Sequence, residues 1–416
     1  MQFHSIIGQK ETKAQLVQMM QHNRLSHALL FLGKEGSGAL SLALAFAQYI
    51  VCEKVNGREG MGNRQQAIGS PLFWENELIE STQPQTPNSK PVTLSDSCGT
   101  CAACTKANQL IHPDIHFSYP VITKKAGEKP ISTDFIKEWR AFIAANPYGN
   151  VYDWLQFIDA ENKQGNITAN ECSDIIRKLN LKSFESEYKI LLVWMPEFLD
   201  KEGNKLLKLI EEPPPNTLFI FVAENENLIL PTILSRTQLV KVPALSNLEV
   251  EAALELRAGV AMQKAQQIAA ISEGNYREAM LLTQNAEDDW QVLLREWLNA
   301  IIKTGPLAQV KWIDETAKLG REKQKQFLKY FIHLLEQAIR LRVIDAANDQ
   351  QPTTNETDFA LRLNKLCSIG QQEAIITELD KASYYIERNA NAKMLFHALS
   401  IRLYHIISNN SLILVN

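Results

Sequence analysis

The sequence predicts an α/β domain with a parallel sheet, followed by a part that contains helices only. Two observations predict this architecture. Over the first 243 residues, short apolar runs of strand length alternate with helical segments, which is the pattern of a parallel sheet. Beyond that point, apolar residues recur only at helical spacing. The runs of strand length are 27–33, 188–195 and 216–223, and the helical segments are 39–51 and 201–210.

The first predicted unit is a strand, a loop and a helix. Residues 27–33 (HALLFLG) are apolar and end in glycine, as a buried parallel strand does. Residues 39–51 (ALSLALAFAQYIV) have the length and residue types of a buried helix. The order of these segments is that of a nucleotide-binding unit, so the loop between them needs inspection.

A second unit follows further along the chain. Residues 188–195 (YKILLVWM) and 216–223 (NTLFIFVA) have strand length and strand composition. The helical segment at 201–210 lies between them, and the three prolines at 213–215 end it. A strand, a helix and a second strand in this order imply a parallel pair.

These patterns divide the chain into three predicted domains. We place the α/β domain at 1–243, a helical lid at 244–288 and an all-helical C-terminal collar domain at 289–416. In the last of these, an apolar face at helical spacing predicts a core helix. That face consists of Phe327, Phe331, Leu334, Leu335, Ala338 and Leu341. The stretch 53–97 is rich in Gly, Asn, Gln, Ser and Pro, and we expect it to be an insertion or a flexible loop that carries no core, within a zinc-module insertion at about 52–104.

The composition excludes several classes of protein. Of the 416 residues, 45% are hydrophobic, which is ordinary for a globular protein, and the net charge is −4. A stand-alone nucleic-acid binder would be basic, so any DNA contact must come from a local patch or from partner subunits. No apolar run approaches the roughly 20 residues of a membrane helix. We therefore expect a cytoplasmic protein with no membrane contact.

The loop from Gly33 to Leu40 (GKEGSGAL) has the strand-to-helix context of a phosphate-binding P-loop, GxxxxGK[ST]. Gly33 and Gly38 fit its register, and Gly36 adds a third glycine. A P-loop lysine pairs with the β- and γ-phosphates and the next hydroxyl holds Mg²⁺, but Ala39 and Leu40 occupy these positions. The sequence thus predicts a degenerate P-loop with no bound ATP, although backbone amides could still hold an anion.

The second half of an ATP site is also incomplete. Paired carboxylates at the end of a later strand normally hold the metal ion and polarise the attacking water. Here the strand ends in VWMPE, where Glu197 is the sole acid and follows a proline. We interpret Glu197 as a solvated loop residue. Two losses in one site make ATP hydrolysis by this chain improbable.

Four cysteines have the spacing of a metal site. Cys98, Cys101 and Cys104 are separated by two residues each, and Cys52 at the end of the first helix can close the site. Thiolates at this spacing can wrap a tetrahedral Zn²⁺, and four protein ligands would make the site structural. An iron–sulfur cluster uses the same ligands, disulfides are disfavoured in the cytoplasm, and chance clustering is the remaining alternative.

Three further segments carry a family resemblance. They are 204–214 (NKLLKLIEEPP), 216–220 (NTLFI) and 230–236 (LPTILSR). Together with the degenerate loop, they resemble the clamp-loader branch of the AAA+ proteins, and within it the delta-prime type of bacterial DNA polymerase III subunit. The resemblance covers about 1–290 with specific motifs and the helical remainder more loosely.

The resemblance implies a fold, a role and partners. Delta-prime subunits keep the AAA+ fold, often lack a working P-loop, and serve in a five-subunit ring that loads the sliding clamp on primed DNA. The implied partners are gamma/tau-type motor subunits and a delta-type subunit. In this family a Ser-Arg-Cys motif presents its arginine to ATP on the neighbouring motor subunit. The motif maps onto Ser235 and Arg236, with Thr237 in place of the cysteine.

The resemblance also bears on two other sites. It implies zinc for Cys52, Cys98, Cys101 and Cys104, and it places Arg277 at the second sensor, an arginine that reads nucleotide on the same chain. With no nucleotide expected, we interpret Arg277 as structural. Two alternatives remain: an ATP-binding motor subunit of the same assembly, which would need the missing lysine and acids, and a zinc-binding scaffold unrelated to replication.

Overall fold

The computed structural model describes residues 1–22, 24–57, 95–123, 129–160, 163, 165–284, 290–344, 355–387 and 390–409. Most of the polar stretch predicted to be an insertion, residues 58–94, lies outside this range. The chain divides into two compact units, Met1–Met280 and Leu281–Asn416. A separate lid at 244–288 and the three-domain division stay predictions. None of the described helices is both long enough and apolar enough to cross a membrane.

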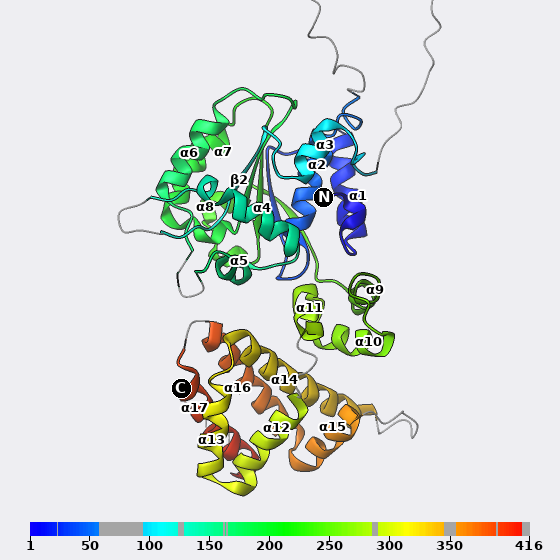
Figure 1. Cartoon of the computed structure of the whole chain (residues 1–416), viewed down its shortest axis with the longest axis vertical. Coiled ribbons are helices and arrows are strands. Elements are labelled where there is room, and N and C mark those ends of the chain that lie inside the picture. The colour runs from blue at the N-terminus through cyan, green and yellow to red at the C-terminus, as the bar shows by residue number, and fades with distance from the viewer. Residues whose placement is uncertain are drawn as a thin grey trace, which may run out of the picture. The chain divides into compact units, whose positions relative to one another are not determined.

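The first unit is built on a five-stranded parallel sheet with the order β2-β3-β4-β1-β5 (Figure 1). Parallel strands are buried on both faces, so their sequences are apolar at consecutive positions. This explains the apolar runs noted above and confirms the predicted parallel sheet. The strands are β1 (Ala28–Leu32), β2 (Ile115–Ser118), β3 (Lys189–Trp194), β4 (Thr217–Ala223) and β5 (Gln238–Lys241).

Helices cover both faces of this sheet. Alternate residues of β4 point to opposite sides: Ile220 packs with α1, α2 and α4, whereas Phe219 packs with α6, α7 and α8. The first group is α1 (Lys10–Gln21), α2 (Ala39–Val51), α3 (Ala102–Asn108), α4 (Ile136–Ala145) and α5 (Val151–Phe157), preceded by the turn η1 (Phe3–Ser5). The second group is α6 (Ala169–Leu179), α7 (Leu207–Glu211) and α8 (Pro231–Leu234).

Short 3₁₀ turns connect several elements of this unit. They are η2 (Ser132–Phe135), η3 (Pro196–Phe198), η4 (Asp200–Leu206) and η5 (Glu226–Leu228). The helix predicted at 201–210 is thus a 3₁₀ segment that continues into the short α7. Gly203 lies in η4, and a Cβ added there would be 2.9 Å from Leu230 Cδ1. A side chain at this position would require the Leu230 side chain to shift.

Three helices follow the sheet in the first unit: α9 (Asn247–Ala258), α10 (Met262–Ile271) and α11 (Tyr276–Gln284), whose last residues cross the unit boundary. Ser246 and Glu249 form a capping box at the start of α9, in which each side chain accepts a hydrogen bond from the other residue's backbone amide. This cap fixes where the chain turns from sheet to helix.

The second unit is entirely helical over its described residues, as predicted. It comprises α12 (Trp290–Asn299), the π-helix η6 (Ala300–Thr304), α13 (Pro306–Thr316), α14 (Arg321–Ile344), α15 (Asn355–Leu366), α16 (Ile369–Glu387) and α17 (Ala392–Asn409). The six residues predicted to form an apolar face of α14 are all buried. Trp297 and Trp312 stack at 4.8 Å in the centre of this unit.

Candidate functional site

The glycine loop predicted to be a P-loop joins β1 to α2 at the carboxyl end of β1, where α/β sheets bind ligands. Gly36 and Gly38 have φ values of +71° and +84°, a region that other residues rarely adopt. The space above them is occupied by the protein itself. A Cβ added at Gly36 would lie 1.9 Å from Asn275 Oδ1, and one at Gly38 would lie 2.7 Å from Tyr148 Cε1.

The cavity that remains beside this loop is small. Its volume is about 30 Å³, and Tyr148, Trp194 and Met195 contribute to its lining together with Gly33, Gly36 and Gly38. Ligand pockets typically measure about 300–1,000 Å³, and roughly 10–15 Å³ of such volume holds one water. Other residues of the first unit therefore surround the glycine loop closely, and the cavity beside it is far smaller than a typical ligand pocket.

An ion triad closes the loop from the side of α11. Arg277 is only 7% exposed, and its guanidinium binds two carboxylates. Nε and Nη2 donate to the two Asp153 oxygens at 2.5 and 2.6 Å, and Nη1 donates to Glu35 Oε1 at 2.9 Å. Asn275 Nδ2 adds a bond of 3.3 Å to the same Glu35 oxygen. An acid of the phosphate loop thus holds the arginine that the resemblance assigns to nucleotide sensing.

Glu35 and Asp153 were missed in the sequence analysis. Glu35 offered a signal, because a carboxylate inside a phosphate loop repels the anion that the loop would hold. Asp153 offered none, because its pairing with Arg277 spans 124 residues. The triad supplies the buried Arg277 with two carboxylate partners inside the first unit.

The strand that should carry the metal-binding acids ends in apolar residues. Trp194 and Met195 are both buried beside the glycine loop. Glu197 was expected to be solvated, and this is wrong. Its Oε1 accepts hydrogen bonds from the backbone amides of Glu224 and Asn225 at 2.7 and 3.0 Å, and burial raises its pKa above the ordinary value. Glu197 ties the end of β3 to the end of β4.

Ser235 and Arg236 follow α8 at the surface of the first unit. Arg236 is one third exposed, and its Nε donates to Glu211 Oε1 at 2.6 Å. Its Nη1 donates to the carbonyl of Thr232 at 2.7 Å and to Ser235 Oγ at 3.1 Å. Glu211 begins the EEPP segment, so the two motifs that carried the family resemblance meet in this ion pair. The pair holds the guanidinium in place while leaving part of it accessible.

The four cysteines predicted to form a metal site lie together. Cys52 follows α2, Cys98 precedes α3, Cys101 is the N-cap of α3, and Cys104 lies within it. Their four sulfurs are all within 4.8 Å of one another, and the Sγ atoms of Cys98 and Cys104 are 3.8 Å apart. A tetrahedral ion with bonds of about 2.3 Å to sulfur separates its ligands by about 3.8 Å. This group could hold a metal ion, and its geometry is compatible with zinc.

Backbone amides prepare these sulfurs for a cation. The amides of Cys98, Cys101 and Cys104 donate to the sulfurs of Cys52, Cys98 and Cys101 at 3.4, 3.3 and 3.4 Å. Such donors stabilise thiolates, which are the form that binds metal. The thiol of Cys104 also donates to Cys52, which lowers the pKa of Cys52 to about 4 and raises that of Cys104.

The other two cysteines, Cys172 and Cys367, are not part of this cluster, and burial raises the pKa of each to about 11. They are therefore thiols at neutral pH. This agrees with their interpretation as ordinary buried residues.

The parallel sheet, the glycine loop after β1 and the helices on both faces form an α/β domain, and a family match assigns this chain to the clamp-loader class. Residues 8–84 and 73–246 match the family described as DNA polymerase III, delta subunit, and these ranges cover more than half of the 416 residues. The chain therefore belongs to this family. The match confirms the resemblance to clamp-loader subunits that the 204–214 and 230–236 segments carried.

Individual relatives are more distant. The gamma/tau subunit of DNA polymerase III from Mycobacterium tuberculosis H37Rv is 24% identical over 56% of this chain, which spans only 27% of that protein. The delta' subunit of DNA polymerase III from Bacillus subtilis is 22% identical over 65% of this chain and 58% of that protein. A gamma subunit-related structure from Thermotoga maritima aligns over 94% of this chain and 99% of that chain at 13% identity, with a TM-score of 0.36, too low to establish a shared fold.

Proposed function

We propose that this chain is a non-hydrolysing clamp-loader subunit of delta-prime type. One set of observations carries the proposal: Asn275 and Tyr148 lie directly against Gly36 and Gly38, Glu35 is paired with Arg277, and the cavity that the loop lines measures about 30 Å³. The sequence supports the same proposal, because Ala39 stands at the position of the P-loop lysine and Met195 lies where a metal-binding acid would be expected. The chain then acts as a structural member of the loader rather than as a motor.

This proposal assigns partners and a domain plan. The chain assembles with gamma/tau-type motor subunits and a delta-type subunit in the cytoplasm, and the complex loads the sliding clamp on primed DNA. The α/β domain at 1–243 and the lid at 244–288 form the ring member, and the helical domain at 289–416 forms the collar of the hetero-oligomer. The net charge of −4 favours DNA contact through the complex rather than through this chain alone.

Within that complex, Arg236 acts in trans on ATP bound to the neighbouring motor subunit. A guanidinium stays charged at all relevant pH values and stabilises the charge that spreads over the phosphate oxygens in the transition state. Glu211 holds Arg236 until the neighbour arrives, and the partial exposure of the pair allows the γ-phosphate to replace the carboxylate. Ser235 supports the arginine through its hydroxyl.

Cys52, Cys98, Cys101 and Cys104 bind one structural zinc ion. The sulfur spacing supports zinc, and four protein ligands leave no open position for a substrate. When bound, the ion supplies cross-links between the end of α2 and the start of α3. The protein groups that prepare the site are the three backbone amides directed at the sulfurs.

Equilibrium binding of a fluorescent ATP analogue tests the non-hydrolysing role, with a motor subunit as the positive control. We expect the motor subunit to bind and this chain to show no saturable binding at millimolar nucleotide. Saturable binding with a Kd in the micromolar range would contradict the proposal and favour the motor-subunit alternative. Failure to assemble with motor subunits in gel filtration would favour the unrelated scaffold.

A further inference from the structure

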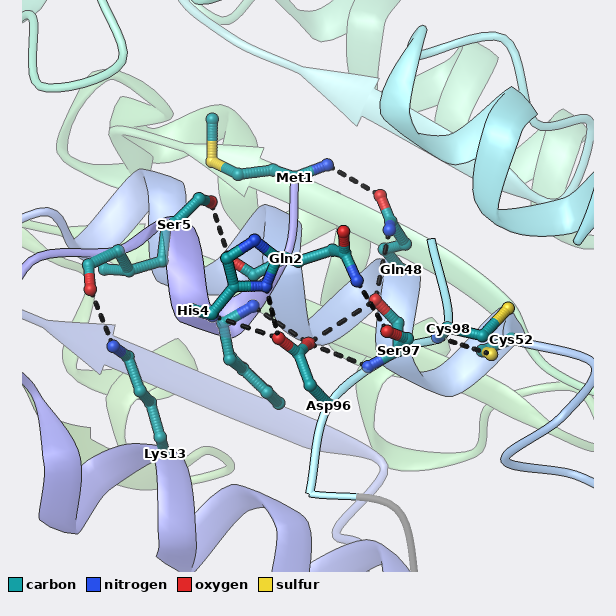
Figure 2. A network of polar contacts seen from close by, with 12 residues as sticks. Met1, Gln2, His4, Ser5, Lys13, Gln48, Cys52, Asp96, Ser97 and Cys98 are labelled. Carbon is teal, nitrogen blue, oxygen red and sulfur yellow. Dashed lines mark hydrogen bonds and ion pairs between the residues drawn. The ribbon is translucent and has the colours of Figure 1, made fainter. Parts of the chain in front are cut away.

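The segment Gln2–Gln9, called here the N-terminal strap, is hydrogen-bonded at one end to Asp96 and Ser97, the two residues that precede Cys98 (Figure 2). Asp96, two residues before the cluster residue Cys98, accepts hydrogen bonds from the backbone amides of Phe3 at 2.9 Å and His4 at 3.0 Å. His4 Nδ1 lies 3.1 Å from the same carboxylate. Gln2 Nε2 donates to the Ser97 carbonyl at 2.6 Å. The Asp96 carboxylate thus binds two strap amides at a position two residues before Cys98.

Asp96 and Ser97 contradict one prediction from the sequence. The stretch 53–97 was expected to carry no core, yet Ser97 is buried and its hydroxyl accepts a bond of 3.1 Å from Gln48 in α2. The hydrogen bonds of Asp96 and Ser97 to the packed domain could not be predicted from the polar composition of the stretch, since Asp and Ser are also common in exposed loops. The last residues of the stretch belong to the packed body.

The other end of the strap reaches the phosphate loop. The Ile7 amide donates to the hydroxyl of Tyr148 at 2.8 Å, and this tyrosine is the residue that fills the space above Gly38. Gln9 Nε2 donates to the carbonyls of Ser37 at 3.2 Å and Pro243 at 2.7 Å. The strap therefore contacts both the loop and the side chain that closes it.

The middle of the strap is held by α9. Arg257 Nη2 donates to the Ser5 carbonyl at 2.7 Å. A Cβ added at Gly8 would lie 2.4 Å from Glu249 Oε1, so the Glu249 side chain of α9 lies directly against the backbone of the strap near Gln9. All of these contacts lie within the first unit. The strap is thus hydrogen-bonded to the residues just before Cys98, to the phosphate loop and its neighbour Tyr148, and to α9.

We propose that Asp96 is the positioning residue through which metal binding at the four cysteines fixes the N-terminal strap, and through it Tyr148 and α9. The inference rests on the proposed zinc site. Metal binding supplies folding free energy to the segments that carry its ligands. Because Cys98 follows Asp96 so closely, a metal-bound Cys98 limits where the carboxylate can lie. The strap then keeps the phosphate loop closed without nucleotide.

Amide hydrogen exchange of the full chain, read by mass spectrometry on peptides, tests this coupling. Three peptides report on it: the strap at 2–9, α9 at 247–258, and β4 at 217–223 as the reference for global unfolding. The samples are the zinc-loaded chain, the chain stripped with a chelator, and the zinc-loaded variants Asp96→Asn and Asp134→Asn. Asp134 is a matched control, because it also accepts a backbone amide, from Ile131 at 3.0 Å, but makes no contact with the strap.

We expect one zinc per chain by native mass spectrometry. Stripping the zinc, or Asp96→Asn, should speed exchange in the strap and in α9 by about tenfold, the effect of losing one charge-assisted hydrogen bond, while β4 stays protected. Asp96→Asn should also weaken zinc binding roughly tenfold in chelator competition, as expected of a residue that orients a metal ligand. Asp134→Asn should change neither property.

Three results would overturn the inference. Zinc that binds and leaves strap exchange unchanged on removal would refute the coupling while the zinc site stands. Equal loss of protection in β4 would mean that zinc stabilises the whole unit without a particular role for the strap. A chain that binds no zinc would refute both the metal site and the coupling.

Discussion

Removing the charge of Arg277 should destabilise the first unit more than removing any exposed charge. Arg277 is 7% exposed, and its partners Asp153 and Glu35 are 20% and 28% exposed, so Arg277→Met removes the positive charge that pairs with two largely buried carboxylates. Breaking a fully buried pair costs about 3–5 kcal/mol. Because water still reaches both acids, we expect about 3 kcal/mol here. At about 2–4 °C per kcal/mol, Tm should fall by about 6–12 °C.

Differential scanning calorimetry of the full chain measures this effect. Arg177→Met is the matched control, because Arg177 is 75% exposed and pairs with Asp174 three residues away on α6, a pair worth no more than about 0.5 kcal/mol. A double-mutant cycle with Glu35→Gln should give a coupling of about 1–2 kcal/mol between Arg277 and Glu35. If Arg277→Met costs no more than Arg177→Met, the triad does not hold α11 to the phosphate loop.

Two further predictions follow from buried groups near β2. Burial, aided by the nearby Lys178 charge, lowers the pKa of His116 to about 4. The unfolded chain takes up this proton near pH 6.5 and the folded chain only near pH 4, so stability should fall as pH drops through that window, by on the order of 2 kcal/mol. In urea titrations at pH 7 and pH 4.5, His116→Gln should lose less stability than wild type; an identical loss would mean that His116 is not involved. Asp114 is buried and accepts the backbone amides of Phe184 at 2.5 Å, Glu185 at 2.7 Å and Ser186 at 2.7 Å. Asp114→Asn should cost about 2 kcal/mol at pH 7, and a cost below about 0.5 kcal/mol would contradict its role as the anchor of this loop.

Local pattern was sufficient for much of the fold. The helix predicted at 39–51 has these bounds in the structure. The strand predicted at 188–195 is one residue too long at each end compared with β3, and the strand predicted at 216–223 begins one residue before β4. The helix is buried on every side and the strands are buried on both faces, so their residues are apolar at nearly every position and the elements can be recognised from the sequence. The four-cysteine cluster could also be predicted from the sequence, because metal ligands need particular residue types at short spacing.

Long-range polar pairs were not predictable from the sequence. Arg277 meets Glu35 across 242 residues, and Asp96 meets Phe3 across 93. No local period marks such a pair, and a single arginine or aspartate is most often solvated. The loss of the P-loop lysine could be recognised from the sequence. The packing of Tyr148 and Asn275 against the glycines of the loop, and the pairing of Glu35 with Arg277, depend on tertiary structure and could not be predicted from the sequence.

The measurement closest to the central claim is DNA-stimulated ATP hydrolysis by a reconstituted complex of this chain with motor subunits, sliding clamp and primed DNA. Arg236→Ala is compared with wild type and with Arg177→Ala, an exposed arginine on a different surface element. The account predicts that all three chains assemble. It also predicts that Arg236→Ala alone lowers hydrolysis at the adjoining ATP site, by roughly 10³-fold as for other arginine fingers. Unchanged hydrolysis in an intact complex would contradict the account and leave Arg236 as a structural partner of Glu211.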